Sequence, residues 1–228
     1  MAVYGCRRCC AAKGSAVGAS GSPASCGRKA CTRGVYGRAS HARPTASTQP
    51  VAPNLLARHF TADAPNRKWV AAITGIATRT GWLYLAGILD VYSRRAIGYA
   101  MDCSRDERLV EDALHMALTS RRPRAGSGLL HHSDRGSQYT AGAYRDLLDA
   151  YGITMSMSEK GEPYDNALME SFFATLKVEC VQRHDFQTPE QARACIFEYL
   201  EVFYNRQRLH SSLGYSSPMA FEHLPVDN

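Results

Sequence analysis

Two acidic residues, Asp134 and Glu170, lie in stretches whose composition suggests chemistry. Asp134 follows His-His-Ser and precedes Arg-Gly-Ser, whereas Glu170 lies within Asp-Asn-Ala-Leu-Met-Glu-Ser. Carboxylates on a strand end and a facing helix suit Mg²⁺ or Mn²⁺, because both ions prefer oxygen ligands. Two such ions can bind the attacking and leaving oxygens of a phosphodiester displacement. The two acids therefore indicate a metal site that acts on phosphate esters.

The elements before Asp134 begin with three predicted strands. Residues 69–77 and 81–90 flank a turn at 78–80, and residues 95–102 follow closely. Short connections between neighbouring strands predict an antiparallel meander. We expect ordered structure to begin near Asn66.

Helical and extended patterns then alternate. Apolar residues in 108–121 recur with the spacing of one buried helical stripe, and a short strand at 129–132 leads to Asp134. A second helix is expected at 141–151, closed by Gly152, with a further strand at 153–157. This order predicts a mixed α/β sheet.

Glu170 is expected on a helix whose faces can be assigned by turning about 100° per residue. Asn166, Glu170 and Lys177 then lie within about 40° of one another, at the edge of an apolar arc. A carboxylate and an ammonium thus share a polar face, which could equally be a solvated surface without a role.

The C-terminal region carries two further signals. Thr188, Pro189 and Gln191 predict a capped helix start with a capping box. The segment 204–210 is basic and aromatic, which fits either a DNA-contacting element or an ordinary cationic helix end.

Composition and charge narrow the class of protein. The chain has 228 residues, 45% hydrophobic and 21% charged, which fits one domain with an appendage. No apolar run approaches the roughly 18 residues of a membrane span, and the start lacks the apolar core of a signal peptide, so we expect a cytoplasmic protein.

The net charge of +6 is unevenly distributed. Residues 1–60 contain no acid, but they contain Arg7, Arg8, Lys13, Arg28, Lys29, Arg33, Arg38, Arg43 and Arg58. Such an arm favours nucleic-acid binding, because contact with phosphate is largely electrostatic; a solvated tail is the alternative.

The cysteines offer a second possible metal site. Most of the 8 cysteines lie near the amino terminus, and a cytosolic location argues against disulfides. Cys6 and Cys9, followed by Cys26 and Cys31, could hold zinc, although the second spacing is loose. Cys103, Cys180 and Cys195 are scattered through the rest of the chain.

Six segments together resemble the integrase-type DDE transposases of bacterial insertion sequences, the group translated from a second, frameshifted reading frame. The segments are residues 69–74, 81–86, 90–95, 132–139, 165–173 and 204–218. The resemblance covers about residues 50–223 and implies a ribonuclease-H-like fold and two divalent ions, Mg²⁺ or Mn²⁺. It also implies homo-oligomers that act on element ends and target DNA.

The resemblance divides the chain and assigns roles to residues. It suggests an arm at 1–60, a catalytic core at 61–223 and a tail at 224–228. Asp134 would be the second catalytic acid and Glu170 the third, both ligating metal. Water would free a 3′ hydroxyl, which then attacks a target phosphodiester without a covalent enzyme intermediate. The DNA-binding residues would be Lys177, Arg135, Arg206 and Arg208.

Two features depart from the family pattern. Ala72 stands where the family has its first catalytic aspartate, which bridges both ions. Its absence should cost at least about 4 kcal/mol of transition-state stabilisation, or about a thousandfold in rate. Residues 5–31 also resemble no DNA-recognising helix, which suggests a degenerate copy of the element.

Several alternatives stay open at this point. Asp90 on the neighbouring strand could replace the missing acid, and His131 or His132 could assist a metal or a proton transfer instead of forming local hydrogen bonds. The chain could also be a non-catalytic DNA-binding regulator, a dominant-negative inhibitor of an active transposase, or an unexpressed relic.

Overall fold

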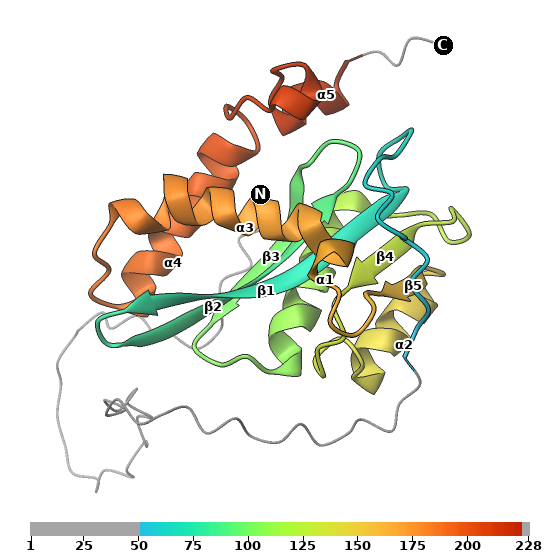
Figure 1. Ribbon diagram of the computed structural model, residues 1–228, viewed down its shortest axis with the longest axis horizontal. Coiled ribbons are helices and arrows are strands. Elements are labelled where there is room, and N and C mark those ends of the chain that lie inside the picture. Colours follow the sequence, from blue (N-terminus) through green and yellow to red (C-terminus); the bar gives the residue numbers. More distant parts are fainter. Residues whose placement is uncertain (1–50, 225–228) are drawn as a thin grey trace, which may run out of the picture. The chain divides into compact units, whose positions relative to one another are not determined.

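A computed structural model describes residues 51–224, apart from the side chain of Pro163 (Figure 1). Its sheet has the strand order β3-β2-β1-β4-β5. The first three strands form the predicted antiparallel meander, whereas β4 and β5 run parallel to β1. The strands are β1 Lys68–Thr78, β2 Gly81–Asp90, β3 Ala96–Asp102, β4 Leu130–Ser133 and β5 Thr154–Met157.

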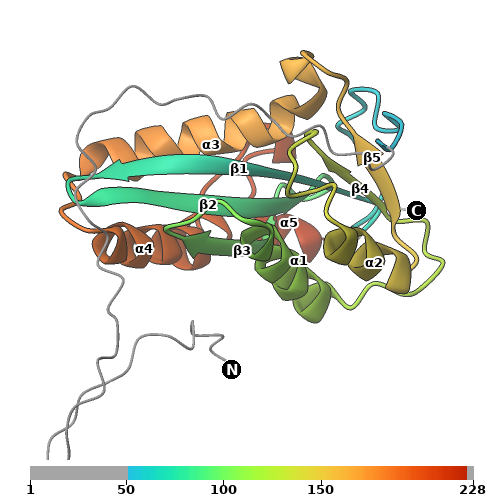
Figure 2. The ribbon, with the colours of Figure 1, turned by 90° about the horizontal axis from the view of Figure 1, so that it is seen from below.

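Helices cover both faces of this mixed sheet, as expected from the sequence. Figure 2 shows α3 on one side and α1 and α2 on the other. The α-helices are α1 Glu107–Arg121, α2 Gly142–Ala150, α3 Ala167–Glu179, α4 Pro189–Glu198 and α5 Pro218–Glu222. Shorter helical turns are η1 Pro163–Asn166, η2 Val181–Arg183, η4 Ser211–Leu213 and the π-helical η3 Tyr199–Tyr204.

The sheet separates two hydrophobic cores. Trp69 and Ala71 of β1 pack with residues of α1 and α2, whereas Val70 packs with residues of α3 and α4. Because successive side chains of a strand point to opposite faces, β1 is buried on both sides. Ala72 is half-buried and lies on the face covered by α3.

The helix ends agree with the sequence signals except at one contact. The Thr188 hydroxyl accepts a hydrogen bond from Gln191 N over 3.4 Å, as a cap of α4 should. The Gln191 side chain, however, accepts from Gln187 N, one residue before the cap, over 2.9 Å. The expected reciprocal capping box is therefore wrong in detail, because the amide oxygen bonds to the preceding N–H instead of the N–H of Thr188.

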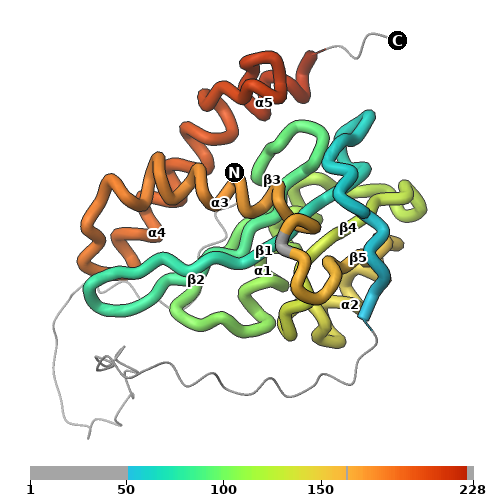
Figure 3. The backbone as a smooth tube through the Cα atoms, viewed as in Figure 1, coloured from blue at the N-terminus to red at the C-terminus, as the bar shows by residue number. Residues whose placement is uncertain are grey.

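Ordered structure begins earlier than the sequence suggests. Leu56 is buried in the core beside α3, and the backbone amides of Leu55 and Leu56 donate to Ser156 Oγ at 2.9 and 3.3 Å. In Figure 3 this first described segment runs beside β5. The expected start near Asn66 is wrong, because these attachments come from distant residues. The basic residues and cysteines before residue 51 lie outside the described part.

Within the described residues, no helix is long and apolar enough to cross a membrane. This finding agrees with the absence of a long apolar run in the sequence.

Gly98 of β3 allows α1 to approach the sheet closely. A Cβ at this position would overlap the carbonyl oxygen of Ala113 and would lie 2.8 Å from the Ala117 side chain. Backbone atoms of a helix cannot yield locally, so the contact requires glycine.

We expect Gly98→Ala to lower the free energy of unfolding by about 2 kcal/mol or more, the cost of forcing extra volume into a packed core. Gly142→Ala is the matched control, because nothing lies within 4 Å of its added Cβ. Denaturant unfolding of both variants measures the difference. Equal stabilities would contradict the close packing of α1 on β3.

Candidate active site

The parallel pairing of β1 with β4 places two site positions side by side. The last paired residues are Ala71 and Ser133, so Ala72 and Asp134 are the next residues on neighbouring strands. Asp134 directly follows β4 and is exposed. The position expected to carry the first acid is thus adjacent to the second.

The start of α3 lies over the same point of the sheet. Asn166 Nδ2 donates to the carbonyl oxygen of Ala71 over 2.9 Å, in a buried hydrogen bond. Gly87 pairs with Ala72, and a Cβ built on Gly87 would contact the side chains of Met169, Phe172 and Phe173 at 3.5–3.6 Å. The first turns of α3 therefore cross the sheet where Ala72 lies.

Glu170 lies in the first turn of α3, four residues after Asn166. Its side chain is exposed and makes no hydrogen bond or ion pair within residues 51–224. Within the described residues, the Asp134 carboxylate accepts one hydrogen bond, from Gly136 N to Oδ1 over 2.8 Å. The fold thus brings both predicted acids to one end of the sheet, with carboxylate oxygens available for a ligand.

The oxygen atoms at this point fit one divalent ion better than two. Asp134 and Glu170 supply carboxylates, and the buried amide oxygen of Asn166 lacks a hydrogen-bond partner among the described residues. The methyl group of Ala72 offers no ligand atom, so a second ion bridged from this position does not fit.

Asp90 does not replace the missing acid. It pairs with Trp69, three residues along β1 from Ala72, which corresponds to about 10 Å. Its buried carboxylate accepts hydrogen bonds from Asn66 N and Tyr92 N at 2.8 and 2.9 Å. Burial raises the pKa of Asp90 above its usual value, and the hydrogen bonds from Asn66 and Tyr92 offset only part of this rise. Asp90 fastens the loops at the far end of β1.

His131 and His132 are buried hydrogen-bonding residues of the core. His131 Nε2 lies 2.5 Å from the Tyr144 hydroxyl, and the ring of His132 contacts the hydroxyls of Ser156 and Ser158 at 2.9 and 3.1 Å. Burial lowers the pKa of His131 to about 3 and that of His132 to about 4. Both imidazoles are therefore neutral near pH 7, and the hydrogen-bonding interpretation accounts for them.

Asp165 anchors the segment before α3, a role that the sequence did not indicate. Its buried carboxylate accepts hydrogen bonds from Glu159 N, Asn54 Nδ2 and Arg58 Nε, each at 2.9 Å. The backbone hydrogen bond from Glu159, together with the Arg58 guanidinium, holds the pKa of Asp165 below its usual value. Two of its partners, Asn54 and Arg58, lie over 100 residues away in the sequence. The only sequence signal for this anchoring role was therefore the acidic residue type itself.

The four cations expected to bind DNA have different environments. Lys177 lies in the last turn of α3 and has no ion-pair partner among the described residues. Arg206 is exposed, and Arg135 donates to Ser158 O over 2.6 Å. Arg208 forms an ion pair of 2.8 Å with Glu179. Lys177 and Arg206 are thus the most available for phosphate.

The segment 204–210 also supports the fold. Asn205 donates to Ala96 O and accepts from Ala96 N at 3.0 and 2.9 Å, while the Tyr204 hydroxyl donates to Arg94 O. These contacts fasten the C-terminal region to the start of β3. Part of the segment thus has a structural role, while the Arg206 side chain is exposed and has no ion-pair partner among the described residues.

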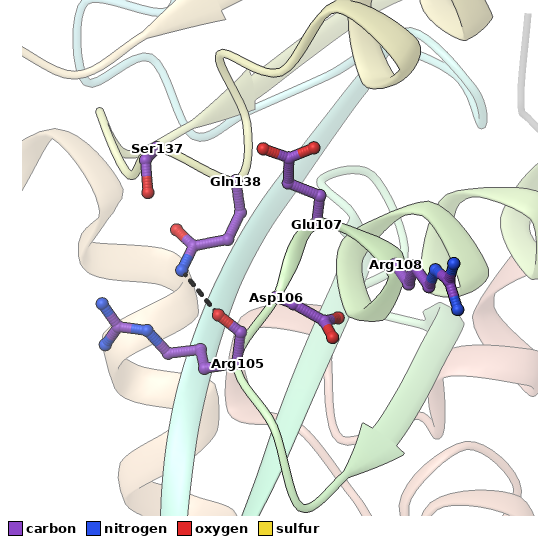
Figure 4. Close-up of a pocket in the computed structure, with 6 residues that line it drawn as sticks. All are labelled: Arg105, Asp106, Glu107, Arg108, Ser137 and Gln138. Atoms are coloured by element: carbon purple, nitrogen blue, oxygen red, sulfur yellow. Dashed lines mark hydrogen bonds between the residues drawn. The ribbon is translucent and has the colours of Figure 1, made fainter. Parts of the chain in front are cut away.

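A shallow hollow of about 330 Å³ lies beside the Asp134 loop. Figure 4 shows its lining, in which Gln138 Nε2 donates to Arg105 O over 3.1 Å. Arg105 and Arg108 contribute positive charge on one side, although Asp106 and Glu107 oppose it. No sequence motif marks Arg105, which lies in the loop before α1.

Comparison with known proteins agrees with this geometry. Two models of the integrase core domain match residues 62–163 and 151–218. A 31 kDa protein of insertion element IS600 from Shigella sonnei is 54% identical over 172 residues, covering 75% of this chain and 62% of that protein. The transposase of IS904 from Lactococcus lactis is 45% identical over 170 residues, which cover 75% of this chain and 66% of that transposase.

The chain belongs to the integrase-type transposases of insertion sequences. Transposase InsF of IS3A from Escherichia coli is also 47% identical over 174 residues, covering 76% of this chain and 59% of InsF. The chain thus spans less than two thirds of the length of these relatives.

Solved structures confirm the ribonuclease-H-like fold of this transposase family. The simian T-cell lymphotropic virus intasome, in complex with a PP2A regulatory subunit, contains a chain with a TM-score of 0.59 and 13% identity, covering 78% of this chain and 59% of that one. The HTLV-2 integrase catalytic core domain in complex with magnesium has a TM-score of 0.56 and 15% sequence identity. The match covers 70% of this chain and 98% of that domain.

The two buried histidines predict a loss of stability in acid. A histidine whose pKa is lowered by folding binds protons more readily in the unfolded state, so its contribution is complete above pH 6.5 and falls towards pH 4. His132→Gln should flatten this fall by up to about 1.4 kcal/mol per pH unit. Denaturant unfolding at several pH values measures the slope.

His115→Gln is the control, because His115 is an exposed residue of α1. This variant should keep the slope of the unmodified chain. A slope unaltered in His132→Gln would show that His132 can be protonated within the folded protein.

Proposed function

We propose that this chain is a transposase core that binds the ends of its insertion sequence but has lost cleavage and strand transfer. The observation that carries this proposal is Ala72 beside Asp134, under the first turns of α3. The family relationship supports DNA as the substrate and assembly of several copies on it. Because that substrate is bacterial DNA, the place of action would be the cytoplasm.

In an active family member, the reaction would need little covalent chemistry from the protein. Asp134 and Glu170 would hold a divalent cation, Mg²⁺ or Mn²⁺, which stabilises the charge that develops on the transferred phosphate. The protein would position the DNA and its attacking hydroxyl, since orientation and electrostatic stabilisation supply most of such rate enhancements. Lys177 and Arg206 are available to bind phosphates, with Arg135 near the Asp134 loop.

The cost of the alanine can be estimated from its position. A bridging carboxylate contributes one negative charge and ligands to two cations, so its absence should cost at least about 4 kcal/mol in the transition state. Neither Asp90 nor the histidines would compensate, because Asp90 bonds to the loops three residues away along β1 and both imidazoles are buried in the core. The fold itself does not need an acid at Ala72, which lies half-buried against the core beside α3.

A second function follows from an intact fold with an incomplete site. Such a chain could occupy element ends, or join active transposase in mixed oligomers, and thereby inhibit transposition. The packed cores and the available Lys177 support this regulator. End-specific binding without cleavage, together with expression in cells, would distinguish it from an unexpressed copy.

The unmodified chain should show no nicking or strand transfer of element ends with Mg²⁺ or Mn²⁺. Ala72→Asp should raise strand transfer by about a thousandfold, because it restores the bridging carboxylate. The assay should use pre-cleaved ends, so that strand transfer is measured without the first cleavage. A version with a family amino terminus should be tested in parallel, so that poor end recognition does not hide restored chemistry.

Ala72→Asn is the matched control, since its side chain has a similar size but no charge. It should stay inactive, and Asp134→Asn should abolish whatever activity Ala72→Asp restores. Robust strand transfer by the unmodified chain, lost in Asp134→Asn, would contradict the proposed inactivity.

Lys177→Ala should weaken binding to element-end DNA and reduce the salt dependence of that binding by about one phosphate contact. Thermal stability should change little, because Lys177 makes no ion pair among the described residues. Arg124→Ala is the control, since Arg124 is exposed and precedes the opposite end of β4. Unaltered affinity in Lys177→Ala, or unfolding of that variant, would contradict a DNA-binding role.

A further inference from the structure

Three side chains that can bind a transition metal lie together at the far end of α3. Cys180 ends that helix, His184 follows η2, and Cys195 lies on α4. The two Sγ atoms are 3.3 Å apart, and one ligand atom from each residue can be chosen so that all three lie within 4.8 Å of one another. These residues are distant from the acidic site, because ten residues of helix separate Cys180 from Glu170 by about 15 Å.

The distances approach those of a tetrahedral metal site. Zinc binds thiolates at about 2.3 Å and imidazole nitrogens at about 2.0 Å, so neighbouring ligand atoms lie about 3.5–3.8 Å apart. Cys195 Sγ lies 3.7 Å from His184 Nδ1 and 4.0 Å from Nε2. Zinc geometry therefore requires the exposed His184 ring to turn so that Nε2 faces the two sulfur atoms.

The hydrogen bonding of His184 suits a metal ligand. His184 Nδ1 lies 2.8 Å from the backbone oxygen of Cys180, so Nδ1 carries the proton and donates it to that carbonyl. This leaves the lone pair on Nε2. The ring also stacks on Phe186, with an interplanar angle of 12°. A backbone carbonyl that accepts from one ring nitrogen while the other binds metal is the usual second contact of a metal-bound histidine.

We propose that Cys180, His184 and Cys195 form a zinc site that fastens the end of α3 to α4. Two thiolates and one imidazole select zinc over the oxygen-preferring Mg²⁺. Cys180 is buried, Cys195 is half-buried and His184 is exposed, so water supplies the fourth ligand from the open side. Burial and the neighbouring Cys195 thiol raise the pKa of Cys180, so metal binding must displace its proton.

Cobalt provides a direct test, because tetrahedral thiolate sites bind Co²⁺ with intense visible bands and a thiolate-to-metal band in the near ultraviolet. The reduced, full-length chain should give these bands and lose them when Zn²⁺ displaces Co²⁺. The variants Cys195→Ser and His184→Gln should each lower the Co²⁺ stoichiometry by one and weaken the bands. Cys103→Ser, which alters a cysteine outside the cluster, should leave them unchanged.

The amino-terminal cysteines could also bind cobalt, so a second comparison is needed. A double variant, Cys6→Ser with Cys9→Ser, should keep the part of the spectrum that is lost in Cys195→Ser. Zn²⁺ should raise the unfolding temperature of the double variant and have a smaller effect on His184→Gln. Because His184 is exposed, that substitution should leave the circular dichroism spectrum of the protein unchanged.

Either of two results would overturn the proposal. The first is a cobalt spectrum and stoichiometry unaltered in Cys195→Ser and His184→Gln, which would place all bound metal elsewhere. The second is a reduced chain that binds neither Co²⁺ nor Zn²⁺ but forms a Cys180–Cys195 disulfide on oxidation, which would make the cluster a thiol pair only.

Discussion

The parallel pairing of β1 with β4 is the constraint on which the rest of the structure depends. It places Ala72 beside Asp134 and makes β1 an inner strand of the sheet, where helices cover both faces and Trp69 and Val70 lie in different cores. A slip of one residue would reverse every side chain of the strand and place a bulky tryptophan against the wrong helices. The burial of β1 on both faces therefore fixes the register, and the register fixes the site.

The separation of folding from chemistry explains how this core can keep its structure without its first acid. The free energy of folding comes from buried residues such as Met169 and Phe172 and from anchors such as Asp165, none of which needs a carboxylate at position 72. Acids clustered for metal binding repel one another when no cation is present, so losing one costs the fold little. Ala72 accordingly lies against the core as an ordinary small residue.

Much of the fold follows from periodicity, because buried stripes repeat every second residue in strands and every third or fourth in helices. The meander, the helices around Leu114 and Phe172, and the strand before Asp134 were all predictable in this way. The attachment of Leu56 was not, since a short irregular segment has no period and its partner, Ser156, lies 100 residues away. The anchoring role of Asp165 was not predictable either, because its partners Asn54 and Arg58 are also distant in the sequence.

The sequence by itself determined the family and the order of the elements, and it marked the two candidate acids, because these depend on local motifs and on repeating patterns. The tertiary structure decided which distant groups meet. It engages Asp90 and His132 in internal hydrogen bonds, pairs Arg208 with Glu179, and gathers Cys180 and Cys195, which look scattered along the chain. Contacts of this kind depend on how helices and strands pack, and no local pattern encodes the distance between side chains on separate elements.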